Sequence, residues 1–242
     1  TLSNGWDDGS HGGDNFGGAI DANGAQLHLT AVEIAGNQAG IGAGISLANA
    51  DGLIQNSSFA LNAAEAAGGG VNFQGDDHRL RIEQTTFSGN TAGGPCSGGA
   101  INAGAFDSGI TQARVDVLSC TIANNSGAGG GGIRTASLSA QGTTTTTLHN
   151  TLLSGNAGGN LVLGTATGPG SVVSQGFNLS DTAEALLNQP SDRTNASAAL
   201  GALANNGGSV RTHQLLPGSA AIDAGLNTGL LFDSRGQQRP RD

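Results

Sequence analysis

The sequence predicts an all-β chain that winds into a right-handed parallel β-helix, a single-stranded solenoid, followed by a less regular C-terminal segment. Three observations lead to this fold class. Glycine supplies 43 of the 242 residues and gathers in clusters, a glycine-led unit returns along the chain before residue 180, and the apolar positions of that unit stay in register. A single unit cannot bury its own apolar face, whereas stacked units share one core.

Each unit begins with a glycine cluster that enters a short apolar strand. The first branched apolar residues after the clusters are Ile20, Ile45, Val71, Ile101 and Ile133, at spacings of 25, 26, 30 and 32 residues. Glycine readily adopts the φ > 0 conformations that a sharp bend requires. The clusters therefore predict the corners of the solenoid, and the apolar residues predict one inward column.

The second half of the unit is an alternating strand that ends at a turn with asparagine. The asparagines are Asn37, Asn62, Asn90, Asn125 and Asn156. Eight residues before them stand Leu29, Ile54, Ile82, Val117 and Leu148, and three before them stand Ile34, Phe59, Phe87, Ile122 and Leu153. These two columns predict the inward register. Amides stacked at one corner predict a hydrogen-bonded ladder, so replacing Asn90 by alanine is expected to cost about 1 kcal/mol.

Composition and charge exclude several classes of protein. All nine basic residues are arginines, and the net charge of −9 disfavours binding to nucleic acid and to anionic lipids. The sequence has no apolar run long enough for a membrane span, and no signal peptide begins at Thr1. The two cysteines, Cys96 and Cys120, are 24 residues apart, close to one repeat. This spacing predicts a disulfide between them in an oxidising compartment, with two free thiols as the alternative.

Residues 1–183 are predicted to form the coils, and residues 184–242 are predicted to form a tail that packs on or caps the β-helix. The segment EALLNQ at 184–189 is expected to be a short helix.

The repeats resemble those of bacterial right-handed β-helix surface proteins of the polymorphic outer-membrane type, which share the GGAI and SGN signatures. The run LGALANNGGSVRTHQLLPGSAAIDAG at 200–225, DSRGQQRPRD at 233–242 and GFNLSD at 176–181 resemble the choice-of-anchor Q domain family. That resemblance implies a bacterial secreted or cell-surface protein, with further coils before residue 1 and a closing strand and anchor after residue 242. The family has no firmly assigned activity.

The outward rows of the strand before the asparagine corner are the place to look for a chemical site. The register stacks Arg79 on Arg114 and Arg81 on Asp116, with Glu83 beside them. A polysaccharide lyase requires a base and a cation that stabilises an enolate, and a glycosidase requires two carboxylates, here Glu83 and Asp116. The structural interpretation is a surface ion pair between Arg81 and Asp116 that contributes little energy.

The loop WDDGSHGGDN at 6–15 is the candidate metal site. Asp7, Asp8 and Asp14 stand among glycines and could supply oxygen ligands to calcium, although the spacing matches no EF-hand. The alternative is a solvated acidic turn. No other cofactor is expected.

Taken together, these features favour an extracellular structural or adhesive scaffold, such as a surface protein, an adhesin stalk or a filament subunit. We expect self-association through the ends of the β-helix, because unpaired strand edges there invite pairing. A cell surface or a polysaccharide is a further expected partner. The alternative is a carbohydrate-active enzyme, a lyase or a glycoside hydrolase, that acts on an acidic polysaccharide through Arg79, Arg81, Glu83, Arg114 and Asp116.

Overall fold

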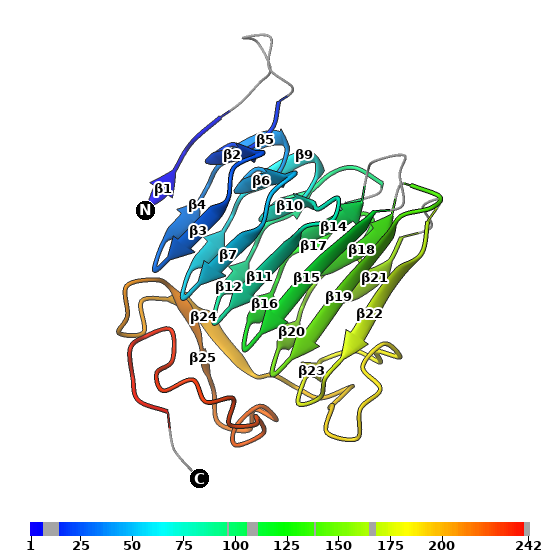
Figure 1. Ribbon diagram of the computed structural model, residues 1–242. Coiled ribbons are helices and arrows are strands. Elements are labelled where there is room, and N and C mark those ends of the chain that lie inside the picture. The colour runs from blue at the N-terminus through cyan, green and yellow to red at the C-terminus, as the bar shows by residue number, and fades with distance from the viewer. Residues whose placement is uncertain (7–14, 96, 106–110, 138, 165–167, 240–242) are drawn as a thin grey trace.

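The protein is a right-handed parallel β-helix, as the sequence predicts (Figure 1). The computed structural model describes residues 1–6, 15–95, 97–105, 111–137, 139–164 and 168–239. Within these ranges the chain has strands and no helix. Successive turns of the solenoid add parallel strands to four sheets, which are numbered I to IV in the order in which the chain visits them from β2 onward.

Two six-stranded sheets form the first half of each turn. Sheet I contains β2 (Ile20–Asn23), β6 (Ile45–Ala48), β10 (Val71–Gln74), β14 (Ile101–Ala105), β18 (Ile133–Ser137) and β21 (Leu161–Leu163). Sheet II contains β3 (Leu27–Thr30), β7 (Gly52–Gln55), β11 (Arg79–Glu83), β15 (Gln112–Leu118), β19 (Thr143–His149) and β22 (Gly170–Ser174).

Two further sheets complete each turn. Sheet III has seven strands, β1 (Leu2–Ser3), β4 (Glu33–Ala35), β8 (Ser58–Ala60), β12 (Thr86–Ser88), β16 (Thr121–Ala123), β20 (Leu152–Ser154) and β23 (Leu179–Ser180). Sheet IV has four strands, β5 (Gln38–Ile41), β9 (Ala63–Ala67), β13 (Thr91–Ala92) and β17 (Ser126–Gly127).

The three inward columns predicted from the sequence are confirmed by the strand pairing. Val71 pairs with Ile45 and Ile101, Ile82 pairs with Ile54 and Val117, and Phe87 pairs with Phe59 and Ile122. The rings of Phe59 and Phe87 stack with their centroids 4.8 Å apart. These side chains belong to one cluster of buried residues that extends along the solenoid axis. Apolar burial along this axis is the main stabilising term.

One corner of the solenoid is made by single residues with positive φ. Gly36, Gly89 and Gly155 make the corner between sheets III and IV, and each is followed by a ladder asparagine. Leu61 occupies the same corner with φ 58°. Left-handed backbone is unfavourable for a residue with a side chain, so Leu61 is a strained member of this column.

The predicted helix at 184–189 is wrong, because this segment forms turns instead. Leu186 and Leu187 pack against the end of the core, and Leu187 is buried. The carboxylate of Asp192 accepts hydrogen bonds from the backbone N–H groups of Asn178 and Gln189, at 3.0 and 2.9 Å. Side-chain acceptors of this kind compete with helical hydrogen bonds. The segment consequently covers the C-terminal end of the coils.

The rest of the tail returns toward the N-terminal coils (Figure 1). It contains an antiparallel hairpin of β24 (Leu200–Ala204) and β25 (Thr212–Leu215). Leu200 and Ala220 pack on a small cluster that includes Leu152 of sheet III and Leu179.

Candidate functional site

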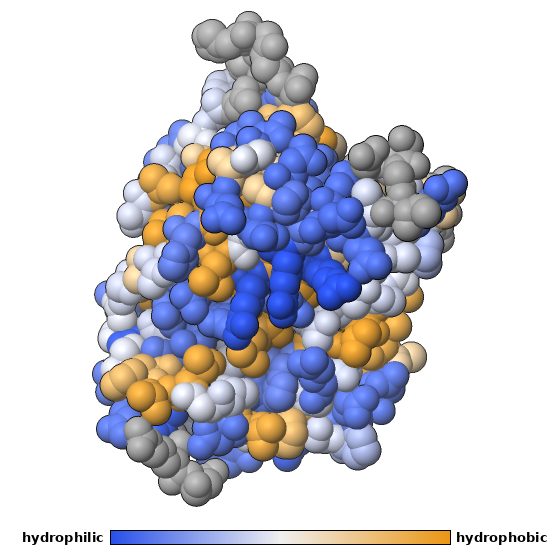
Figure 2. Space-filling view, in the orientation of Figure 1, coloured by the Kyte–Doolittle hydropathy of each residue, from blue (hydrophilic) through white to orange (hydrophobic). Residues whose placement is uncertain are grey.

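The outer face of sheet II carries the candidate site residues in the predicted register. Arg79 pairs with Arg114, Arg81 with Asp116, and Glu83 with Leu118 on the neighbouring strand. In Figure 2, strongly hydrophilic side chains gather in the middle of this view, where Figure 1 places β7, β11 and β15. The sequence therefore located a charged face that spans adjacent coils.

The ion pairs on this face differ from the expected one. Asp116 pairs with Arg79, its diagonal neighbour, instead of with Arg81. Arg81 pairs with Glu83 on its own strand, and the Glu83 side chain is almost completely buried. Gln55 also donates a hydrogen bond to Glu83, with Nε2 2.6 Å from Oε2. The long arginine side chains reach past their register partners, so backbone register alone could not assign these pairs.

A depression of about 350 Å³ lies on this face. Its lining residues are Arg79, Gln112, Ala113, Arg114, Asp116, Thr143, Thr145 and Thr147, which come from β11, β15 and β19. Within it, Nη2 of Arg114 donates to Oε1 of Gln112 at 2.7 Å. The hydroxyl of Thr145 lies 3.0 Å from that of Ser171 on β22. Guanidinium and hydroxyl groups together suit carboxylated or hydroxylated ligands.

The two carboxylates of this face differ in their surroundings. Glu83 is held by Arg81 and Gln55 at the far end of β11, whereas Asp116 lines the depression next to Arg79. A glycosidase pair needs both carboxylates to face one substrate. Only Asp116 belongs to the lining of the depression, so the arrangement suits binding better than paired-carboxylate hydrolysis.

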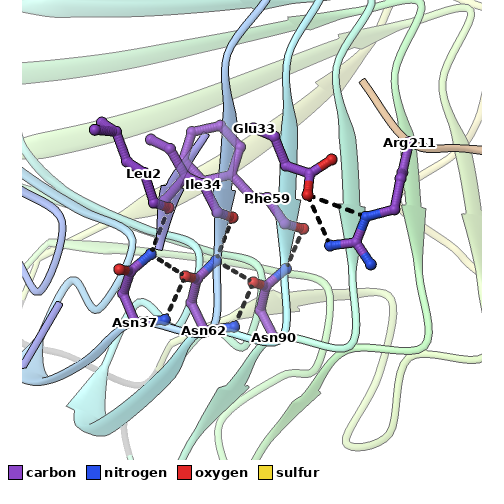
Figure 3. A network of polar contacts seen from close by, with 8 residues as sticks. All are labelled: Leu2, Glu33, Ile34, Asn37, Phe59, Asn62, Asn90 and Arg211. Carbon is purple, nitrogen blue, oxygen red and sulfur yellow. Dashed lines mark hydrogen bonds and ion pairs between the residues drawn. The ribbon is translucent and has the colours of Figure 1, made fainter. Parts of the chain in front are cut away.

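The asparagine ladder forms as predicted (Figure 3). Nδ2 of Asn62 donates to Oδ1 of Asn90 at 2.9 Å and to the carbonyl oxygen of Ile34 at 3.0 Å. The backbone N–H of Asn62 donates to the same Oδ1 at 3.1 Å. The pattern continues through Asn125 and Asn156 and ends at Oδ1 of Asn160. The ladder satisfies buried polar groups at the corner between sheets III and IV, which is a structural role.

At the N-terminal coil the ladder ends at a glycine. The backbone N–H of Gly5 donates to Oδ1 of Asn37 at 2.8 Å, in the position that an asparagine occupies in later coils. A Cβ on Gly5 would lie 2.0 Å from the carbonyl oxygen of Gly18, so no side chain fits there.

A second ladder, at the corner between sheets II and III, was missed by sequence reasoning. It consists of Ser57, Thr85, Cys120 and Thr151, each of which donates from its side chain to the carbonyl oxygen two residues earlier. The members also bond between coils, as when the backbone N–H of Ser57 donates to Oγ1 of Thr85 at 3.4 Å. The signal in the sequence was a residue able to donate a hydrogen bond five positions before each later ladder asparagine.

Cys120 is a buried member of this second ladder and has no disulfide partner among the residues that the structure describes. Sγ lies 3.3 Å from the carbonyl oxygen of Leu118. Burial raises the pKa of the Cys120 thiol to about 12, which keeps it protonated and unreactive. Cys96 lies outside the described residues, so the expected disulfide stays a prediction.

The candidate calcium ligands Asp7, Asp8 and Asp14 also lie outside the described residues. In the part of the chain that the structure does describe, no three His, Cys, Asp or Glu side chains converge as a metal site would require. Calcium binding therefore stays a prediction, and a calcium-dependent rise in melting temperature would support it.

Comparisons with protein-family models, with curated proteins and with solved structures find no match. The fold and its two ladders define the chain as a parallel β-helix repeat protein. The resemblance to the choice-of-anchor Q family stays an expectation. Among the described residues, no helix has the length and hydropathy needed to cross a bilayer.

Proposed function

We propose that the protein is an extracellular β-helix scaffold whose outer sheet II face is adhesive and binds an acidic polysaccharide. The observation that carries the proposal is the depression lined by Arg79, Arg114 and a row of threonines. The core and ladders repeat from coil to coil, so each strand of sheet II holds its outward side chains at a fixed height along the axis. Such a face can present several polar groups to one extended polysaccharide molecule.

Arg114 is the residue best suited to contact the ligand. Its guanidinium bonds to an amide oxygen, that of Gln112, whereas Arg79 and Arg81 already have carboxylate partners. Arginine binds carboxylates through two parallel hydrogen bonds, which is a stronger interaction than an amide provides. A uronate carboxylate can therefore displace Gln112 with a gain in free energy.

Binding to immobilised polysaccharides tests the proposal. The protein should be retained by polygalacturonate or alginate and released by salt, because the contacts are charged. Neutral dextran should not retain it. Arg114→Ala should weaken binding about 10-fold, and Arg235→Ala, which removes an exposed arginine of the tail, should leave it unchanged. Failure to bind any acidic polymer, or equal losses in the two variants, would contradict the proposal.

The enzyme alternative is tested in the same incubations. Asp116 beside Arg79 is the observation that favours it, because a lyase needs a base next to a cation. Turnover would appear as unsaturated products or new reducing ends. If turnover occurs and Asp116→Asn abolishes it while binding persists, the scaffold proposal is replaced by a lyase or glycoside hydrolase.

Self-association through an end of the solenoid is part of the proposal, and two features of the described coils support one end over the other. The turns at 184–193 cover the C-terminal end, where Arg193 bridges to Leu179. At the other end β1, β2 and β3 are edge strands, and Leu27 and Leu29 are only partly buried. We therefore assign self-association to the N-terminal edge.

A proline substitution can test this edge without breaking the solenoid. The N–H groups of Leu27 and Ala31 donate to the second coil, so alternation points the N–H of His28 away from it. His28→Pro should preserve the fold and abolish concentration-dependent association in sedimentation velocity. A monomeric wild-type protein at high concentration would contradict this part of the proposal.

A further inference from the structure

The C-terminal tail contacts coils that are far away in the sequence. Both Nε and Nη2 of Arg211 bond to Oε1 of Glu33 on β4, at 3.2 and 3.0 Å, and the two residues are 178 positions apart (Figure 3). Nε2 of His213 lies 3.0 Å from Oγ of Ser88 on β12. Nη2 of Arg239 donates to Oε1 of Gln84 at 3.1 Å. The segment 199–239, here called the strap, thus joins the capped end of the solenoid to its early coils.

Sheet III offers the strap a flat surface. Phe59 and Phe87 face inward, so Ala60 and Ser88, one residue later, face outward. Both are nevertheless buried, as is Ala123 on the next strand. Small side chains on this outer face allow the tail to lie close to the strands.

The first coil is less well buried than the coil that follows it. The interior residues Ile20 and Leu29 are partly buried, whereas their register partners Ile45 and Ile54 are completely buried. In a stacked repeat each unit is stabilised mainly by its neighbours, so a terminal unit opens most easily.

We propose that the strap couples the two ends of the solenoid, so that the N-terminal coils open only when the strap is released. Arg211 acts as the far anchor, because both of its hydrogen bonds to Glu33 are charge-assisted. Coupling of this kind is reciprocal: loosening β4 weakens the strap, and loosening the strap weakens β4. The proposal is independent of the adhesive function of sheet II.

Hydrogen exchange resolved by mass spectrometry on the whole chain tests the proposal. Arg211→Gln should raise exchange about 3- to 10-fold in peptides covering β3 and β4. Glu33→Gln should raise exchange in the strap hairpin, residues 200–215, by a similar factor. The double variant should show little further change, because both single variants break the same contact. Arg235→Gln, which breaks an ion pair confined to the tail, is the matched control and should leave β3 and β4 protected.

Two results would overturn the proposal. One is unchanged protection of β3 and β4 in Arg211→Gln. The other is an increase confined to β4 in Glu33→Gln, with the hairpin unaffected, because a merely local contact gives that pattern. If Arg211→Gln does not fold, His213→Ala provides a second test, since it removes the contact with Ser88 further along the strap. Unchanged exchange at β12 and in the early coils of that variant would also contradict the coupling.

Discussion

The interior of the solenoid and the outer face of sheet II are built from the same strands but follow different rules. Inside, each turn repeats the same chemistry, as in the column of Ile54, Ile82 and Val117. Outside, the adjacent row changes at every turn, from Leu53 to Arg81 to Asp116. Packing restricts an interior position to a few residue types, whereas a solvated position is free to vary. Individual function is therefore to be sought on the outer face.

The largest expected effect comes from removing a ring of the interior stack. Phe87→Ala should lower the free energy of unfolding by about 3–5 kcal/mol, because Phe87 is completely buried and packs on Phe59. Arg114→Ala, which removes an exposed side chain on the outer side of β15, should lower it by less than about 1 kcal/mol. Urea denaturation measures both values. Similar losses in the two variants would remove the distinction between interior and face.

The asparagine ladder should show a smaller effect that depends on position. Asn90→Ala deprives the backbone N–H and Nδ2 of Asn62 of their shared acceptor, so about 1–3 kcal/mol is expected. Asn156→Ala, near the end of the ladder, should cost less, because the 9% exposed fraction of Asn156 gives water access to the groups left behind. An unchanged melting temperature for Asn90→Ala would refute a stabilising ladder.

Replacing Cys120 by serine tests whether this residue acts as a hydrogen-bonding member of the second ladder or forms the expected disulfide. Cys120→Ser places a hydroxyl where Ser57 has one, so the change in stability at pH 7 should stay within about 1 kcal/mol. Loss of a disulfide would cost about 2–5 kcal/mol. Calorimetry of the two proteins separates the possibilities.

The buried thiol of Cys120 should also make the stability of the protein depend on pH in the alkaline range. Because the pKa of the folded-state thiol is raised from 9.0 to about 12, the folded protein holds this proton more tightly than the unfolded chain. Its contribution to stability is complete below pH 9 and is lost as the pH rises toward 12. Cys120→Ser should lack this component, and an identical alkaline decline in both proteins would contradict the assignment.

The smallest expected effect concerns the corner between sheets III and IV. Leu61→Gly should raise stability by about 0.5 kcal/mol, because relief of left-handed strain exceeds the entropy that glycine loses on folding. Leu61→Ala keeps the Cβ and should bring no gain. A destabilised glycine variant would mean that the exposed Leu61 side chain contributes more than its backbone strain costs.

The sequence predicted the interior because the interior repeats. The columns through Ile45, Ile82 and Phe87 and the asparagine ladder could be aligned from spacing alone, and the register also placed Arg79 over Arg114. The partners of those arginines could not be predicted, because a long side chain reaches several neighbours of similar energy. The second ladder could not be predicted from residue identity, because serine, threonine and cysteine fill the same hydrogen-bonding role and the position therefore does not repeat one residue type.

The path of the strap could not be predicted either. Its contacts, such as that of His213 with Ser88, join residues 125 positions apart and follow no period. Residues 184–189 form turns instead of the predicted helix, because Asp192 supplies side-chain acceptors and Leu187 enters the core.

Nuclear Overhauser contacts between asparagine side-chain amides test the central claim most directly, which is that successive coils lie directly over one another. The amide protons of Asn62 should show contacts with those of Asn37 and Asn90, and those of Asn90 with Asn125, because each Nδ2 lies within 2.9 Å of the next Oδ1. Contacts only between residues close in sequence, with none between successive asparagines, would contradict the stacked solenoid.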